Sequence, residues 1–173
     1  PEHVQKYEAK LRPEHVQRSP KNAGMIHSLD ENVGRIMRSL EELKLADHTL
    51  LIFASDNGSM WGAHGIAGKW NMYEESIRVP LIILDPRMGS QNPGRREQMA
   101  LNIDLAPTLL DLAGVSPCKT MQGRSLRPLL AGRKVPWRES FLYTYFQESW
   151  QPGIPTVLAV RTKSWKYARY PDI

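Results

Sequence analysis

The stretch Thr49-Leu50-Leu51-Ile52-Phe53-Ala54-Ser55-Asp56-Asn57-Gly58 decides how this chain folds and where its chemistry lies. Residues 49–55 form an apolar run bounded by turn residues, which is typical of a short strand buried on both faces. The run continues directly into a carboxylate, an amide and a glycine. Because open α/β sheets bind ligands beyond the carboxyl ends of their strands, we expect a functional site at Asp56 and Asn57.

The side chains of Asp56 and Asn57 supply oxygen donors of the kind that calcium prefers, and calcium binds about six to eight of them. The same residues, followed by Gly58, also favour an ordinary turn. Taken alone, this segment leaves a metal site and a plain turn as alternatives.

Helix and strand patterns alternate on both sides of this segment. Apolar residues recur at helical spacing over residues 25–43, with Asn22 placed to cap the helix. A second buried run over residues 79–84 predicts another strand, and residues 105–113 predict a second helix. Such alternation is typical of an α/β fold, and we expect the chain to form part of a mixed, mostly parallel sheet flanked by helices.

Beyond Gly114 the pattern changes to a connector rich in Pro and Gly, with one helical turn at residues 126–130. Aromatic and β-branched residues then predict three strands, the last two joined by a hairpin-length link. These strands are expected at residues 141–146, 156–161 and 165–170 and predict a small antiparallel C-terminal sheet. At the other end, Pro-Glu-His-Val-Gln occurs twice within residues 1–17, a stretch predicted to form loop or short helical turns.

Composition excludes several classes of protein. The 173 residues are 41% hydrophobic and 24% charged, as in a folded domain. No apolar run approaches the roughly 20 residues that span a membrane. The formal net charge is +5, and residues 112–173 hold 10 of the 23 basic but only 3 of the 18 acidic side chains. We do not expect nucleic-acid binding, because these basic residues form no helical stripe and interleave with Pro and Gly.

A glycine-rich loop follows the decisive stretch and carries His64 and Lys69. Lys69 is either an anion-binding lysine or an ordinary surface residue, and His64 is either an acid–base group or structural. The loop is not a nucleotide-binding P-loop, because Ala63 and Trp70 stand where that motif needs glycine and a hydroxyl residue.

Taken together, these motifs closely resemble the sulfatase family of the alkaline-phosphatase-like superfamily. The likeness runs from about Ala23 to Tyr170. Its central elements are Ser55-Asp56-Asn57-Gly58, His64-Gly65, Gly68-Lys69 and Tyr73-Glu74-Glu75-Ser76-Ile77-Arg78-Val79-Pro80, supported by Met25-Ile26-His27-Ser28-Leu29-Asp30, Asp104-Leu105-Ala106-Pro107-Thr108 and Met121-Gln122-Gly123-Arg124-Ser125-Leu126.

The resemblance implies that Asp56 and Asn57 coordinate a calcium ion and that Lys69 contacts the sulfate. It also implies a formylglycine nucleophile made from a C/S-x-P-x-R motif, which this sequence lacks. Cys118 is followed by Lys119-Thr120-Met121-Gln122 and is therefore not that nucleophile.

We therefore expect residues 1–137 to be the carboxyl-side part of a sulfatase catalytic domain and residues 138–173 to begin a small C-terminal subdomain. The parent protein is expected to hydrolyse a sulfated small molecule or glycan, and the isolated chain is expected to be inactive. The family is commonly periplasmic, secreted or lysosomal, but the sequence shows no targeting segment.

Two alternatives stay open. One is a phosphatase or phosphonate hydrolase of the same superfamily, which would differ at the nucleophile. The other is a truncated paralogue without catalysis that binds anionic glycans through its basic residues 112–173.

Overall fold

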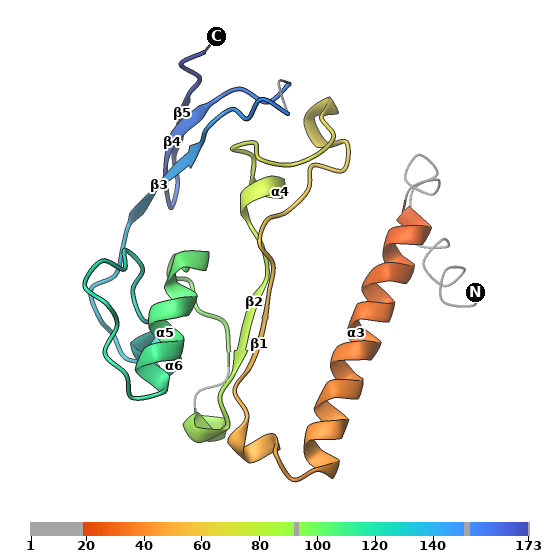
Figure 1. Cartoon of the computed structure of the whole chain (residues 1–173), viewed down its shortest axis with the longest axis vertical. Helices are drawn as coiled ribbons and strands as arrows, with labels where there is room; N and C mark the ends of the chain where they lie inside the picture. Colours follow the sequence, from red (N-terminus) through yellow and green to blue (C-terminus); the bar gives the residue numbers. More distant parts are fainter. Residues whose placement is uncertain (1–18, 92–93, 151–152, 173) are drawn as a thin grey trace. The chain divides into compact units, whose positions relative to one another are not determined.

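The computed structural model describes residues 19–91, 94–150 and 153–172 and divides the chain into two compact units, residues 1–50 and residues 51–173. The repeated pentapeptide at the start of the chain lies outside the described residues. Figure 1 labels the helices and strands. In chain order they are α3 (Ser19–Glu42), β1 (Leu51–Ala54), α4 (Glu74–Ile77), β2 (Leu81–Leu84), α5 (Leu105–Leu112), α6 (Arg127–Leu130), β3 (Ser140–Tyr145), β4 (Val157–Thr162) and β5 (Lys166–Arg169).

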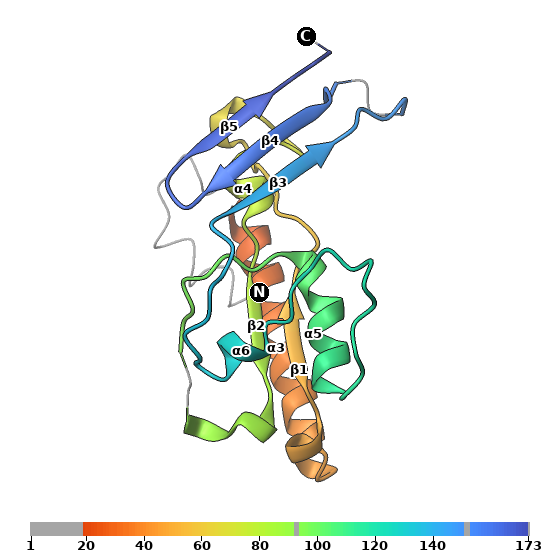
Figure 2. The same ribbon diagram turned by 90° about the vertical axis from the view of Figure 1, so that its left-hand side faces the viewer.

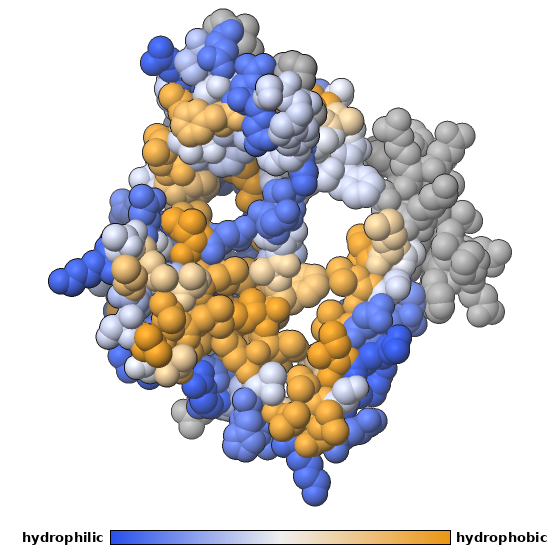
Figure 3. Space-filling view, viewed as in Figure 1, coloured by the Kyte–Doolittle hydropathy of each residue, from blue (hydrophilic) through white to orange (hydrophobic). Residues whose placement is uncertain are grey.

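Helix α3 accounts for most of the described part of the first unit. It begins at Ser19, three residues before the predicted cap at Asn22. Pro20 is compatible with this start, because the missing N–H of a proline in a first helical turn costs no hydrogen bond. It ends where Lys44 adopts a left-handed conformation and Leu45 N–H donates to Leu40 O at 2.8 Å. An apolar stripe along the helix is exposed, as Figure 3 shows by hydropathy. Its members include Met25, Ile26, Leu29 and Ile36.

Strands β1 and β2 pair antiparallel, with Leu51 opposite Leu84 and Ala54 opposite Leu81. The expected mixed, mostly parallel sheet is not found among the described residues, whose two sheets are both antiparallel. Parallel neighbours need a crossover that returns the chain to the opposite end of the sheet. Residues 55–80 instead fold back at the same end, and α4 is the only α-helix in that connection.

Helix α5 confirms the predicted second helix to within one residue. It ends at Leu112, and Gly114, two residues further on, has a φ of +75° that suits glycine, while Val115 N–H closes the turn on Leu110 O at 2.8 Å. The predicted turn at residues 126–130 is present as α6, with Pro128 in its first turn.

The predicted C-terminal antiparallel sheet is confirmed, with strand order β3-β4-β5. Figure 2 shows the three strands side by side. One face packs on the segment around α4, where the buried residues Met72, Val157 and Ala159 form a core with Ile77, Tyr143, Tyr145 and Ala168. Because the sheet shares this core with the segment around α4, it supports the loop that leads into α4.

The domain boundary predicted at residue 137 stays a prediction.

Candidate functional site

Asp56 and Asn57 lie directly beyond the end of β1, as the sequence predicts. Asn57 N–H donates to Asp56 Oδ1 at 2.7 Å, and Asn57 Nδ2 donates to Gly58 O at 2.9 Å. These bonds fix the two side chains locally. Oδ2 of Asp56 and Oδ1 of Asn57 accept no hydrogen bond from any described residue, so both oxygens are available to a cation.

Gly58 lets the strand end press against α4. Its N–H donates to Ser76 O at 2.8 Å, and a Cβ at this position would lie 2.0 Å from Glu75 O. No side chain fits in that space, so glycine is required here by close approach of two backbones. This contact fixes the Asp56-Asn57 turn relative to α4.

The loop after Gly58 is closed on itself. Met60 is buried, its N–H donates to Gly68 O at 2.8 Å, and the Ser59 hydroxyl donates to the same oxygen at 3.2 Å. Gly62, Gly65 and Gly68 all have positive φ, so the glycines permit the tight path. The loop brings the chain back next to its own start and leads directly into Lys69.

Lys69 is half-buried and lies over an aromatic ring. Its Nζ is 4.9 Å from the centroid of the Trp70 ring, and no carboxylate of a described residue lies within ion-pairing distance of it. Trp70 is itself stacked on Tyr145 of β3, with centroids 5.9 Å apart. A held ammonium without an acidic partner is suited to binding an anion.

His64 contacts acidic and aromatic neighbours. Its Nε2 is 3.6 Å from Glu75 Oε1, and its ring stacks on Tyr73 with centroids 4.1 Å apart. The residue is exposed, and its backbone φ of 56° is uncommon for a residue other than glycine. Tyr73 and Glu75, at the start of α4, thus orient the imidazole, and the sequence did not predict these contacts.

The loop before α4 is also held by the C-terminal sheet. Glu74 accepts from Arg161 Nε at 2.9 Å and pairs with Lys166 Nζ at 3.0 Å, and Lys166 also donates to Met72 O. The hydrogen bond from the Arg161 guanidinium is the main reason why the pKa of Glu74 lies below its usual value. Lys166 lowers this pKa further, against an opposing effect of burial.

Three further residues support the strand end, and sequence reasoning missed them. Asn102 Nδ2 donates to Asp56 O at 2.8 Å and to Ser55 O at 3.1 Å. The turn that carries Asn102 is fixed by the fully buried carboxylate of Asp104, which pairs with the Arg138 guanidinium. The partners are far apart in sequence, so no local pattern signals them. The only local signal is the polar Asn-x-Asp turn before a predicted helix.

The donor set at the strand end fits part of a calcium site. Asp56 and Asn57 present two uncommitted oxygens of the correct type, out of the roughly six to eight that calcium binds. No group of three or more His, Cys, Asp or Glu residues within the described ranges could hold a metal by itself. Any calcium at Asp56 and Asn57 therefore needs other ligands as well.

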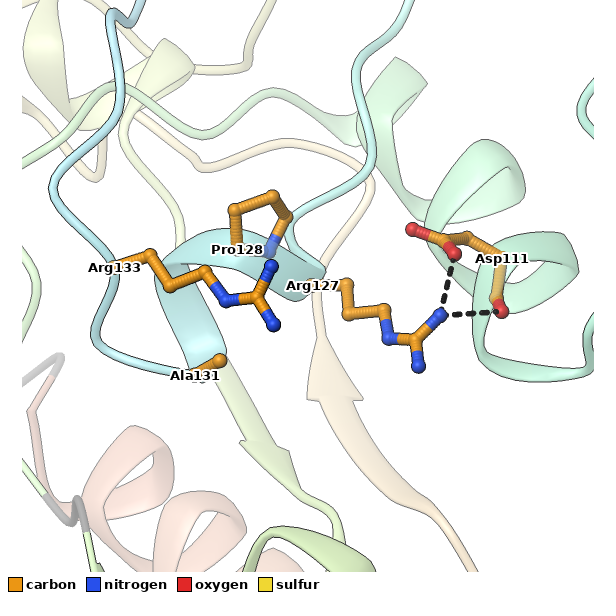
Figure 4. Close-up of a pocket in the computed structure, with 5 residues that line it drawn as sticks. All are labelled: Asp111, Arg127, Pro128, Ala131 and Arg133. Carbon is orange, nitrogen blue, oxygen red and sulfur yellow. Dashed lines mark hydrogen bonds and ion pairs between the residues drawn. The ribbon is translucent and has the colours of Figure 1, made fainter.

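A hollow of about 330 Å³ lies elsewhere in the second unit and contains none of the predicted site residues. Figure 4 shows Asp111 of α5 facing Arg127, with Pro128, Ala131 and Arg133 along the wall. The Asp111 carboxylate accepts from the Ser125 hydroxyl and from Arg127 Nη1, and these contacts lower its pKa. This hollow is not the candidate site, because none of the predicted site residues lines it and the Asp111 carboxylate is already paired with Ser125 and Arg127.

Comparison with known proteins identifies the family. The family model described as Sulfatase matches residues 2–115, and the one described as N-sulphoglucosamine sulphohydrolase, C-terminal, matches residues 62–172. Because the first match covers more than half of the chain, this chain belongs to the sulfatase family of the alkaline phosphatase superfamily. This confirms the family resemblance carried by the motifs around Asp56 and Lys69.

Individual relatives agree with this membership. An N-acetylglucosamine-6-O-sulfatase of Bacteroides thetaiotaomicron is 35% identical over 146 residues, which are 83% of this chain and 26% of the relative. The structure of BT4656 in complex with its substrate D-glucosamine-2-N,6-O-disulfate matches with a TM-score of 0.82 and 31% identity over 90% of this chain and 32% of that one. A phosphonate monoester hydrolase of Agrobacterium radiobacter matches with a TM-score of 0.79 and 29% identity over 88% and 32%.

The chain spans about a quarter to a third of the length of these relatives. The fold prediction of an alkaline-phosphatase-like architecture is thus confirmed as a match to the sulfatase fold, although the strands described here form only small antiparallel sheets. None of the helices in the described part of the chain has the length and apolar character needed to cross a bilayer.

Proposed function

We propose that these residues supply part of the active site of a sulfuric ester hydrolase. The observation that carries the proposal is the pair of uncommitted oxygens on Asp56 and Asn57 at the end of β1, together with a half-buried lysine, Lys69, that has no described acidic partner. Membership of the sulfatase family supports the same chemistry.

Asp56 and Asn57 would hold a calcium ion through Oδ2 and Oδ1. When bound, calcium would act as a Lewis acid towards the sulfate oxygens and as a template for the ester. The protein's own part is to keep both oxygens in place before the ion arrives. The bonds from Asn57 N–H to Asp56 and from Asn57 Nδ2 to Gly58 O serve that purpose.

Lys69 would bind the sulfate group and offset negative charge that grows on the leaving oxygen. Its location over the Trp70 ring restricts the long side chain, so less conformational entropy is lost when the anion binds. His64 is the candidate proton donor or acceptor, oriented by Glu75 and Tyr73.

The nucleophile is proposed to lie outside these 173 residues. The family resemblance implies formylglycine, and the sequence holds no C/S-x-P-x-R motif from which it could be made. Without a covalent nucleophile the displacement at sulfur loses its main step. We therefore expect no sulfate-ester turnover by the isolated 173-residue chain.

The proposed substrate class is a sulfated sugar or glycan. BT4656, whose structure matches this one, binds a sulfated glucosamine, and the excess of basic side chains over residues 112–173 would favour an anionic substrate.

A second candidate function is phosphonate monoester hydrolysis, favoured by the match to the Agrobacterium radiobacter enzyme. Sulfate and phosphonate monoesters present similar tetrahedral anions, so Asp56, Asn57 and Lys69 suit either one. The nucleophile and the remaining metal ligands would decide between them.

The test uses the protein expressed from the complete reading frame that contains these residues. Its kcat/KM is measured with 4-methylumbelliferyl sulfate and with a p-nitrophenyl phosphonate, for Lys69→Ala and for Lys163→Ala, a matched control on the exposed β4–β5 turn. We expect hydrolysis of the sulfate, a loss of about 100-fold or more in Lys69→Ala, and no change in the control. Preferential hydrolysis of the phosphonate supports the second candidate instead, and full activity of Lys69→Ala contradicts the role of Lys69.

A further inference from the structure

The end of β1 is held by a side chain from a distant part of the chain. The carboxamide of Asn102 has two N–H protons, and Nδ2 donates both to Asp56 O at 2.8 Å and to Ser55 O at 3.1 Å. These are consecutive carbonyls of the backbone that presents the Asp56 and Asn57 side chains. One amide thus fixes the two peptide groups on either side of the Asp56 Cα.

The turn that carries Asn102 is itself rigid. Asp104, fully buried, accepts from Leu101 N–H and Arg124 N–H, both at 2.8 Å, and from the Arg138 guanidinium. A Cβ on Gly123 would lie 1.9 Å from Ile103 O, so the neighbouring chain packs directly on the turn. The Asn102 amide is therefore presented from a turn whose buried carboxylate accepts hydrogen bonds on both oxygens.

We propose that Asn102 is a positioning residue for the cation ligands Asp56 and Asn57. This inference rests on the proposed function, because it concerns the same strand end. Without the Asn102 amide, two adjacent carbonyls would need water as partner, and the turn that carries the two ligands would keep only its local bonds and the Gly58 contact with Ser76. By holding them, Asn102 keeps Asp56 Oδ2 and Asn57 Oδ1 in the arrangement that a cation requires.

The two hydrogen bonds from the Asn102 amide to Ser55 O and Asp56 O are here called the Asn102 clamp. The first test measures whether this clamp holds the strand end, and it needs neither metal nor activity. Amide hydrogen exchange of residues 51–58 is followed in the 173-residue chain for Asn102→Asp and Asn102→Ala. Asn102→Asp keeps the side-chain size but places a carboxylate against two carbonyls, and Asn102→Ala removes the donor without adding charge. The matched control is Ile103→Ala in the same turn, because the Ile103 side chain is 52% exposed and leaves the amide in place.

Both Asn102 variants are expected to exchange the strand-end amides roughly 10-fold faster than the parent chain and the Ile103→Ala control. The amides of β3 to β5 should keep their rates in every variant, which separates local loosening from global unfolding. Unchanged exchange at residues 51–58 in both Asn102 variants overturns the clamp.

The second test measures positioning, by calcium titration of the protein from the complete reading frame. We expect the Asn102 variants to bind calcium roughly 10- to 100-fold more weakly, with Ile103→Ala unchanged. Faster exchange with unaltered calcium affinity overturns the positioning role. If the unmutated protein from the complete reading frame binds no calcium at all, the proposed metal site fails, and the role of Asn102 toward that site fails with it. The exchange rates still decide whether the clamp exists.

Discussion

The guanidinium of Arg138 pairs in bidentate fashion with the fully buried carboxylate of Asp104, 34 positions earlier in the chain. Arg138 Nη1 also donates to Met99 O at 3.1 Å, and the neighbouring Trp137 Nε1 donates to the same oxygen at 2.7 Å. The residues just before β3 are thereby joined to the turn that precedes α5.

Removing one partner of this pair should be costly. Arg138→Ala leaves a buried carboxylate without its cation, and we expect the free energy of unfolding to fall by about 3–5 kcal/mol. Urea denaturation of the 173-residue chain measures this, with Arg133→Ala as the control, because Arg133 is exposed and should change stability by less than about 0.5 kcal/mol. Equal stability of the two variants would show that the pair does not stabilise the fold.

Gly58→Ala tests the close approach of the strand end to α4. The added Cβ meets Glu75 O at 2.0 Å, and backbone atoms cannot move aside as a flexible side chain would. We expect a loss of about 1–3 kcal/mol in unfolding free energy. Gly153→Ala is the control, since nothing described lies within 4 Å of the added atom. A Gly58→Ala variant as stable as the control contradicts the described contact.

The pH dependence of stability tests the contact of Glu74 with the C-terminal sheet. The pKa of Glu74 is lowered in the folded chain, mainly by Arg161, so folding favours its ionised form. The stabilisation is fully present above the ordinary carboxyl pKa and is lost as pH falls through the lowered value.

Glu74→Gln should therefore destabilise the chain by about 1 kcal/mol at pH 7, a modest value because the side chain is partly exposed and screened by solvent. The difference from the parent chain should shrink as the pH falls below the ordinary carboxyl range. Urea denaturation at several pH values measures it, with Glu139→Gln as an exposed control. A difference that grows towards low pH is incompatible with a lowered pKa.

The thiol of Cys118 provides a local test away from the site. It is exposed, and a hydrogen bond with the Thr120 hydroxyl at 3.1 Å lowers its pKa. Thr120→Val should raise that pKa and slow alkylation by iodoacetamide at pH 7 by roughly two- to fivefold, since less thiolate is present. Thr144→Val, an exposed position on β3, should leave the rate unchanged. An unaltered rate in Thr120→Val removes the hydroxyl as the cause.

Local patterns predicted the elements of this fold well, because helical periodicity, β-branched runs and breakers such as Gly114 act within a few residues. The mixed, mostly parallel sheet expected from the alternation is not found among the described residues, where β1 and β2 pair antiparallel. An apolar run carries no sign of strand direction, which here depends on how residues 55–80 fold back. The expected burial on both faces is also wrong, because no residue of β1 is fully buried and Ile82 and Leu84 of β2 are 63% and 51% exposed. The start of α3 was also placed too late, because Asn22 is a plausible cap inside a longer helix.

In the candidate site, too, sequence patterns predicted some residues and missed others. Asp56, Asn57, His64 and Lys69 stand in short motifs and could be named from sequence, but their roles stay predictions. Their supports could not be named. Asn102 reaches Asp56 from 46 positions away, and Arg161 reaches Glu74 from 87, so only the folded structure brings these groups together.

The most direct test of the central claim is a crystal structure of the protein from the complete reading frame, grown with calcium and a sulfate ester. We predict a calcium ion within about 2.3–2.6 Å of oxygens of Asp56 and Asn57, with Lys69 Nζ in hydrogen-bonding contact with the sulfate. Calcium bound away from the end of β1, or sulfate bound away from Lys69, would contradict the proposed function.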